Sequence, residues 1–170
     1  MELSIKNIKI FISDVDGVMT DGGLFYINDC LYRKFNVKDG IGIKMLKIVG
    51  IEIAILSSNV SVQTKNRFLS LGVNLYFEGI KEKDKFIEGF LKENNLQWDN
   101  VCYMGDDLQD IKPIRKASFS ICPSDAVEEI KEIVNYVCKR KGGEGAFREG
   151  VEKLTKKIGK WEKIKKEYLL

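Results

Sequence analysis

The amino-acid sequence predicts an α/β fold with a mostly parallel β-sheet. Short apolar runs rich in β-branched and aromatic residues alternate along the chain with segments whose apolar residues recur at a helical period. Runs of nearly continuous apolarity are typical of strands buried on both faces, as in a parallel sheet covered by helices. The chain has 170 residues, which is enough for one domain with a substantial core, and we expect a single domain over residues 1–170.

Six apolar runs are expected to be the strands of this sheet, and amphipathic helices are expected between them. Two of the helical segments are followed by Gly50 and Gly72, and glycine is common just after a helix. The expected strands are residues 9–13, 51–56, 74–77, 101–104, 119–122 and 135–138, and the expected helices are residues 41–49, 62–71, 84–94 and 126–134.

Two segments add to this core pattern. Residues 22–35 predict a β-hairpin insertion after the first strand, because two β-rich runs flank a turn at Asn28-Asp29. In the C-terminal tail, about residues 142–170, apolar residues recur at roughly helical spacing from Leu154 to Tyr168. This spacing predicts a helix that packs against the core.

The composition excludes several classes of function. The chain contains no histidine, so catalytic triads and metal sites that need histidine are excluded, and a bound metal must prefer oxygen ligands. The net charge of +3 is too small to indicate a nucleic-acid partner. We expect a cytoplasmic protein with no membrane partner, because no apolar run approaches the ~20 residues that span a bilayer and no signal peptide is apparent. The four cysteines are scattered and form neither a zinc motif nor a disulfide framework.

Polar residues follow several of the predicted strands. Asp14 and Asp16 come directly after the first strand, Ser57 follows the second, Asp106 follows the fourth, and Lys83 lies near the start of a helix. Parallel strands bring such residues to one edge of the sheet. Carboxylates gathered there remain ionised together only beside a cation, for which Mg²⁺ is the natural candidate. The set could bind and cleave a phosphate monoester, with one carboxylate as nucleophile and another as general acid.

The order of these motifs, DVDGVMTDG, ILSS, Lys83 and GDDLQD, resembles the haloacid dehalogenase superfamily over nearly the whole chain. The resemblance implies a Rossmann-like three-layer sandwich and an aspartyl-phosphate intermediate. Asp14 would be the nucleophile and Asp16 the general acid and base. The remaining implied roles are phosphate binding by Ser57 and Lys83, metal binding by Asp14, Asp16 and Asp106 with a backbone carbonyl of the first loop, and support from Asp107 and Asp110, the latter steadying the metal site or Lys83.

Two further segments, FNVKDGIGIKMLK and GGEGAFREGVEKL, resemble the 3-deoxy-D-manno-octulosonate 8-phosphate (KDO 8-phosphate) phosphatase family of lipopolysaccharide biosynthesis. Segments 17–56 and 58–82 are too short for a separate cap domain, which predicts a capless enzyme. The resemblance implies a homotetramer that the hairpin helps to assemble, in which a neighbour's tail reaches the active site. Glycines 142, 143 and 145 would make that tail flexible. Arg67 and Arg148 are the candidates for binding the carboxylate of the sugar-acid phosphate.

One departure leaves the substrate open. Where the family has Thr-Gly-Arg, or Thr-Gly-Glu in enzymes for nine-carbon sugars, this chain has Ser57-Ser58-Asn59. The alternatives are a nonulosonate (sialic acid or KDN) 9-phosphate phosphatase, a sugar-phosphate phosphatase of broad range, and a non-catalytic assembly domain like the C-terminal domain of animal CMP-sialic acid synthetase. A signalling receiver domain is disfavoured, because its acidic pair and its acceptor aspartate follow strands in a different order.

Overall fold

A six-stranded parallel sheet forms the centre of the computed structural model, which describes residues 5–28 and 30–169. The strand order is β5-β4-β1-β6-β7-β8, so β1 lies inside the sheet and pairs with strands on both sides. The predicted α/β fold with a parallel sheet is confirmed. The strands are β1 (Ile10–Ser13), β4 (Glu52–Leu56), β5 (Leu75–Phe77), β6 (Val101–Met104), β7 (Phe119–Cys122) and β8 (Tyr136–Val137).

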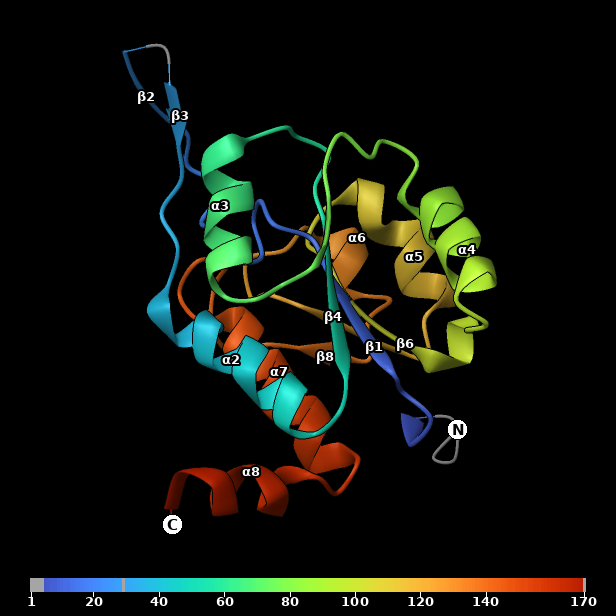
Figure 1. Ribbon diagram of the computed structural model, residues 1–170. Coiled ribbons are helices and arrows are strands. Elements are labelled where there is room, and N and C mark those ends of the chain that lie inside the picture. Colours follow the sequence, from blue (N-terminus) through green and yellow to red (C-terminus); the bar gives the residue numbers. More distant parts are fainter. Residues whose placement is uncertain (1–4, 29, 170) are drawn as a thin grey trace.

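Helices cover both faces of the sheet, giving three layers (Figure 1). Phe11 packs with one group of helices and its neighbour Ile12 with the other, because successive side chains of a strand point to opposite faces. One face is covered by α2 (Val37–Ile48), α3 (Val62–Ser70), α7 (Ala146–Lys157) and α8 (Trp161–Leu169), and the other by α4 (Lys83–Glu93), α5 (Ile111–Lys116) and α6 (Glu128–Lys131). The chain also forms two 3₁₀ turns, η1 (Trp98–Asn100) and η2 (Leu108–Asp110).

Several predicted helix boundaries were wrong. Helix α2 begins at Val37 rather than residue 41, because the Asn36 side chain accepts a hydrogen bond from the Lys38 N–H group and caps the helix. Helix α6 is a single turn instead of spanning residues 126–134. The tail forms two helices, α7 and α8, separated near Gly159, whose φ of 75° ends the first helix.

The predicted hairpin is confirmed as an antiparallel pair of strands, β2 (Phe25–Ile27) and β3 (Cys30–Tyr32). It forms a sheet of its own that projects from the body (Figure 1). The side chains of β2 are exposed, with exposed fractions of 55% for Phe25 and 71% for Tyr26. Within the described part of the chain, no helix combines the length and apolarity needed to cross a bilayer.

The glycine-rich segment before α7 is packed and does not act as a flexible link, contrary to the prediction. The Gly142 N–H group donates to Asp125 Oδ1 at 2.9 Å, and the Gly143 N–H group donates to the Val18 carbonyl at 3.2 Å. A Cβ atom at Gly142 would lie 1.9 Å from the Gly17 carbonyl oxygen. Glycine is therefore needed here because two backbone segments approach closely.

Asp39 joins α2 to the start of α7. The N-cap of α7 is Gly145, which has no side chain to cap the helix, and Asp39 Oδ1 instead accepts a hydrogen bond from the Arg148 N–H group at 2.9 Å. Asp39 is only 3% exposed, and its Oδ2 atom has no hydrogen-bond partner. Burial raises the pKa of Asp39 to about 6, although the Arg148 N–H group and nearby arginines favour the charged form.

This raised pKa predicts a pH-dependent stability. The folded protein holds a proton on Asp39 at higher pH than the unfolded chain does, so the free energy of unfolding falls as pH rises from about 4 to 6. In Asp39→Asn this pH-dependent fall in the free energy of unfolding is absent. From pH 4 to pH 7.5, we expect the free energy of unfolding of the variant to rise by about 1–3 kcal/mol relative to that of wild type, measured by urea unfolding. The same difference at both pH values would contradict a titrating Asp39.

Candidate active site

The carboxyl ends of three neighbouring strands form the site. Ser13, the last residue of β1, pairs with Ile55 in β4 and with Met104 in β6. The chain therefore leaves all three strands at one edge of the sheet, and the polar residues that follow lie close together. Asp14 directly follows β1, and Ser57 directly follows β4. Asp106 comes after Gly105 at the end of β6, and Lys83 is the first residue of α4.

Lys83 is a buried cation between two carboxylates. Its Nζ atom lies 2.8 Å from Asp14 Oδ2 and 2.7 Å from Asp110 Oδ1, and its side chain is 0% exposed. Burial opposes the charged form of Lys83, but the two carboxylates outweigh it and raise the pKa of Lys83. The ammonium group thus stays charged and offsets part of the negative charge at the site.

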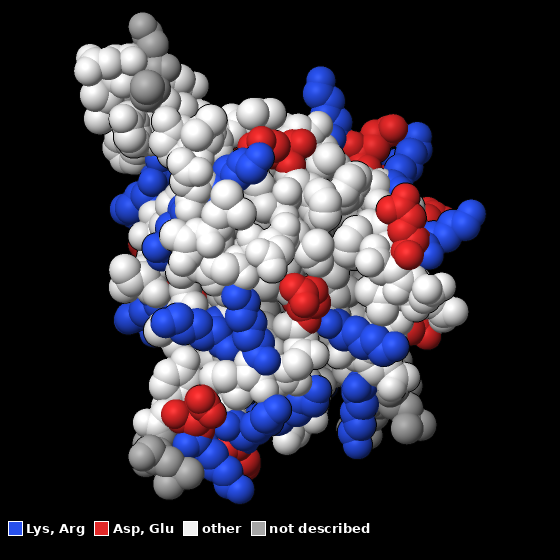
Figure 2. Space-filling view, viewed as in Figure 1, with Lys and Arg blue, Asp and Glu red and all other residues white. Residues whose placement is uncertain are grey.

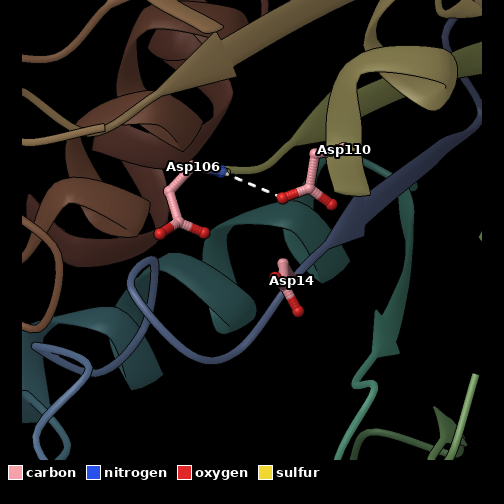
Figure 3. Close-up of side chains that lie close together, drawn as sticks. All are labelled: Asp14, Asp106 and Asp110. Atoms are coloured by element: carbon pink, nitrogen blue, oxygen red, sulfur yellow. Dashed lines mark hydrogen bonds between the residues drawn. The ribbon is translucent and has the colours of Figure 1, made fainter. Parts of the chain in front are cut away.

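Asp14, Asp106 and Asp110 form a cluster of acidic side chains (Figure 3). One oxygen from each lies within 4.8 Å of the others. Burial, together with the charges of neighbouring aspartates, raises the pKa of Asp14 to about 7 and that of Asp106 to about 8. The buried Oδ1 atom of Asp106 has no hydrogen-bond partner. A hard divalent cation would relieve this repulsion and bind that oxygen, so the residues fit Mg²⁺.

The predicted metal set was Asp14, Asp16 and Asp106 with a backbone carbonyl of the first loop. The Asp16 side chain lies outside this cluster, and the carboxylate beside Asp14 and Asp106 is that of Asp110. Asp110 is fully buried and also binds Lys83. It accepts hydrogen bonds from the Tyr103 hydroxyl group at 2.7 Å and from the Asp106 N–H group at 3.1 Å. Asp110 is therefore placed to fix both Lys83 and Asp106. Asp107 is exposed and accepts a hydrogen bond from the Leu108 N–H group at the start of η2.

Asp16 is bound by two residues that the sequence analysis did not assign to the site. The Arg33 guanidinium donates from Nε and Nη2 to the two carboxylate oxygens, the latter at 3.3 Å. The Asn59 side chain also donates to Asp16 Oδ2, at 2.9 Å. Arg33 lies between the hairpin and α2, where the sequence pattern gives no indication of the direction of a long side chain.

A backbone N–H group and a glutamine side chain also contact Asp14. The Val15 N–H group donates to Asp14 Oδ1 at 2.7 Å, and Gln109 Nε2 lies 3.4 Å from Asp14 Oδ2. Gln109 also approaches Ser58 Oγ, at 2.8 Å. Ser57 is 2% exposed, and its hydroxyl group donates to the Asn59 carbonyl at 3.0 Å. To donate to a phosphoryl oxygen, the Ser57 hydroxyl must rotate away from that carbonyl.

Gly17 lets the first loop approach Asp106. Its φ is 81°, and a Cβ atom there would lie 1.9 Å from Asp106 Oδ2. The left-handed backbone conformation favours glycine, and a side chain at this position would have to displace the Asp106 carboxylate. The glycine of the Asp-x-Asp-Gly motif therefore places the loop after β1 directly against the carboxylate that follows β6.

Arg67 and Arg148, the predicted carboxylate ligands, surround Asp39 instead of the acidic cluster. Both contribute positive charge at Asp39. The Arg148 guanidinium is also paired with Glu152, with Nε 2.8 Å from Oε1. Arg148 lines a cavity of about 510 Å³ that also contains Lys38, Lys139 and Arg140.

Metal binding at the acidic cluster predicts stabilisation by Mg²⁺. The free energy of unfolding of the wild type should rise with Mg²⁺ concentration, by about 2.7 kcal/mol at 100 times the dissociation constant. Asp106→Asn should lose this response, because the cluster loses a carboxylate with an unpartnered oxygen. The matched control is Asp107→Asn, an exposed neighbour that caps η2, which should keep it. Thermal unfolding with Mg²⁺ or EDTA measures both, and an equal response in Asp106→Asn and wild type would contradict the site.

Comparisons with known proteins agree with this geometry. A family model for haloacid dehalogenase-like hydrolases matches residues 73–148. The chain is 37% identical over 161 residues to the 3-deoxy-D-manno-octulosonate 8-phosphate phosphatase KdsC of Haemophilus influenzae, covering 94% of this chain and 89% of that protein. It is 33% identical to KdsC of Escherichia coli K12, covering 94% and 86%.

Solved structures of similar proteins have the same fold. The phosphatase of the same name from Moraxella catarrhalis, in complex with magnesium, phosphate and KDO, superposes with a TM-score of 0.93 at 30% identity, covering 98% of this chain and 97% of that one. The cobalt-bound form from Haemophilus influenzae superposes with a TM-score of 0.86 at 36% identity, covering 92% of each chain.

Proposed function

Since this chain belongs to the family of 3-deoxy-D-manno-octulosonate 8-phosphate phosphatases among the haloacid dehalogenase-like hydrolases, we propose that it hydrolyses that ester to 3-deoxy-D-manno-octulosonate and phosphate. The observation that carries the proposal is the buried Asp14, held beside Lys83 and the unpartnered Asp106 oxygen. Such a set can bind a dianionic phosphate next to a carboxylate nucleophile. We infer a capless single domain, because the described residues of segments 17–56 and 58–82 contain no elements besides the hairpin, α2, β4, α3 and β5.

Asp14 is the proposed nucleophile. One of its oxygens attacks phosphorus as the bond to the sugar oxygen breaks, which gives an aspartyl phosphate on Asp14. Lys83 and the Val15 N–H group bind the carboxylate and fix its direction. The Lys83 charge and the Ser57 hydroxyl would stabilise negative charge on the phosphoryl oxygens.

Asp16 is the proposed general acid and base. It gives its proton to the leaving sugar oxygen in the first step, and then takes a proton from the water that attacks the aspartyl phosphate. Asp14, Asp106 and the loop at Asp16 would hold Mg²⁺, with Asp110 fixing Asp106. When bound, Mg²⁺ supplies charge stabilisation to the phosphoryl oxygens as a Lewis acid.

We also propose a cytoplasmic homotetramer assembled through the hairpin, with no nucleic-acid or membrane partner. The hairpin supports this assembly, since it presents exposed apolar side chains at Leu24, Phe25, Tyr26 and Ile27. In Figure 2 the described residues of this projection are white, the colour of uncharged residues, on the visible face. Apolar surface of this kind is usually covered by a partner, and a second copy of the chain supplies an identical hairpin.

The test is phosphate release at neutral pH with Mg²⁺ from two esters, octulosonate 8-phosphate and a nonulosonate 9-phosphate. We expect a higher kcat/KM for the eight-carbon ester. Preference for the nine-carbon ester would keep the chemistry but move the substrate to sialic-type sugars, the alternative that remains open because Asn59 matches neither form of the family motif. Release from neither ester would contradict the proposed function.

A further inference from the structure

The guanidinium group of Arg33 is buried against Asp16. Only 2% of the Arg33 side chain is exposed, compared with 23% of the Asp16 side chain. Nε and Nη2 donate to the two oxygens of Asp16, and Nη1 lies 3.5 Å from Thr64 Oγ1. The planar guanidinium thus donates two hydrogen bonds to one carboxylate. This bidentate geometry matches the shape of a carboxylate as well as its charge.

This pairing conflicts with the proposed role of Asp16. Its two oxygens face Arg33 and the Asn59 amide, which donates at 2.9 Å. A general acid must instead turn a protonated oxygen towards the leaving group, within hydrogen-bond reach. Asp16 must therefore leave Arg33 before it acts. Its departure would leave a buried guanidinium without a counter-charge, which is unfavourable unless another carboxylate takes its place.

We propose that the carboxylate of the sugar acid takes the place of Asp16 on Arg33 when the substrate binds, and that this exchange frees Asp16 to reach the leaving oxygen. The inference rests on the proposed function, because that substrate carries a carboxylate as well as a phosphate ester. A phosphate ester without a carboxylate offers no replacement, so Asp16 stays on Arg33 and turnover is slow. Arg33 is then the residue that determines specificity for sugar acids.

The neighbouring Lys34 provides a matched control. It lies in the same segment between the hairpin and α2 and also forms an ion pair with the first loop, through Asp21. In contrast to Arg33, 60% of its side chain is exposed. Replacing Lys34 therefore removes a cation and an ion pair of this segment, while the two hydrogen bonds from Arg33 to Asp16 are kept.

The test compares wild type, Arg33→Met and Lys34→Met on octulosonate 8-phosphate and on arabinose 5-phosphate, a sugar phosphate without a carboxylate. We expect Arg33→Met to lower kcat/KM for octulosonate 8-phosphate by about tenfold or more, the effect of losing a charged bidentate contact. For arabinose 5-phosphate, kcat/KM should stay the same or rise, because Asp16 is free. Lys34→Met should keep the wild-type ratio. Partial unfolding cancels from the ratio, because each preparation is assayed on both substrates.

If the ratio of the two kcat/KM values in Arg33→Met is the same as in wild type, the exchange is overturned. An equal fall of both values would leave Arg33 with a structural role. Failure of the wild type to hydrolyse octulosonate 8-phosphate would be a separate result. It would contradict the proposed function, and the inference would fall with it.

Discussion

Asp14→Asn should abolish turnover, lowering kcat by about 10³-fold or more. An amide is a poor nucleophile for phosphorus, and it cannot form the aspartyl phosphate. Asparagine has nearly the same size as aspartate, and its oxygen can still accept the hydrogen bond from the Val15 N–H group. The chemistry should therefore be lost while the fold is kept.

Steady-state phosphate release from octulosonate 8-phosphate with Mg²⁺ measures this loss. Circular dichroism and thermal unfolding of the same preparation give the folded fraction. A folded Asp14→Asn protein with kcat within tenfold of wild type would show that another group attacks phosphorus.

Lys83→Met should have the largest effect on stability. Lys83 is fully buried between Asp14 and Asp110, and removing one partner of a buried ion pair leaves uncompensated charge that typically costs about 3–5 kcal/mol. We expect the free energy of unfolding at neutral pH, in EDTA, to fall by about that amount. Turnover should also fall by about 10²-fold or more, because a charge on the phosphoryl oxygens is lost.

The loss of stability in Lys83→Met should depend on pH. The pKa of Asp14 is already raised by burial and by Asp110, and removing Lys83 takes away a group that lowers it. Asp14 should therefore take up a proton in the folded variant at a higher pH than in wild type, where its pKa is about 7. The difference in unfolding free energy between the two proteins should then be smaller at about pH 6 than at about pH 9. The control is Lys85→Met, which removes an exposed ion pair with Glu82. Because such surface pairs contribute little, this variant should keep the wild-type stability. An equal loss at both pH values would mean that packing, not charge, explains the effect.

The sequence predicted the sheet and the strand-end residues because both depend on local patterns. Strands buried on both faces are mostly apolar, so the sequence predicted strands at residues 101–104 and 119–122. These are the bounds of β6 and β7 in the structure. Parallel strands also order the residues that follow them, which explains why Asp14, Lys83 and Asp106 meet as expected. Helix α5 was not predicted, since Pro113 disrupts a helical pattern but is tolerated near a helix start.

Long-range contacts could not be predicted in the same way. Arg33 reaches Asp16 across 17 positions of the chain, and neither residue pattern nor spacing fixes the direction of that side chain. Gly142 suggested flexibility, whereas its contact with the Gly17 carbonyl depends on how two loops meet in the folded chain. The sequence also could not show that the Arg148 N–H group is capped by Asp39 or that its guanidinium is paired with Glu152. The role of Arg148 as a substrate ligand stays a prediction.

The stereochemical course at phosphorus tests the proposed mechanism most directly. The measurement uses an octulosonate 8-thiophosphate that is chiral at phosphorus by oxygen-isotope labelling, hydrolysed by the wild-type protein with Mg²⁺ in water labelled with a further oxygen isotope. Each in-line displacement inverts phosphorus. Attack by Asp14 followed by attack of water on the aspartyl phosphate predicts net retention in the released thiophosphate, as read by NMR. Net inversion would show that water attacks the ester directly, and it would contradict Asp14 as the nucleophile.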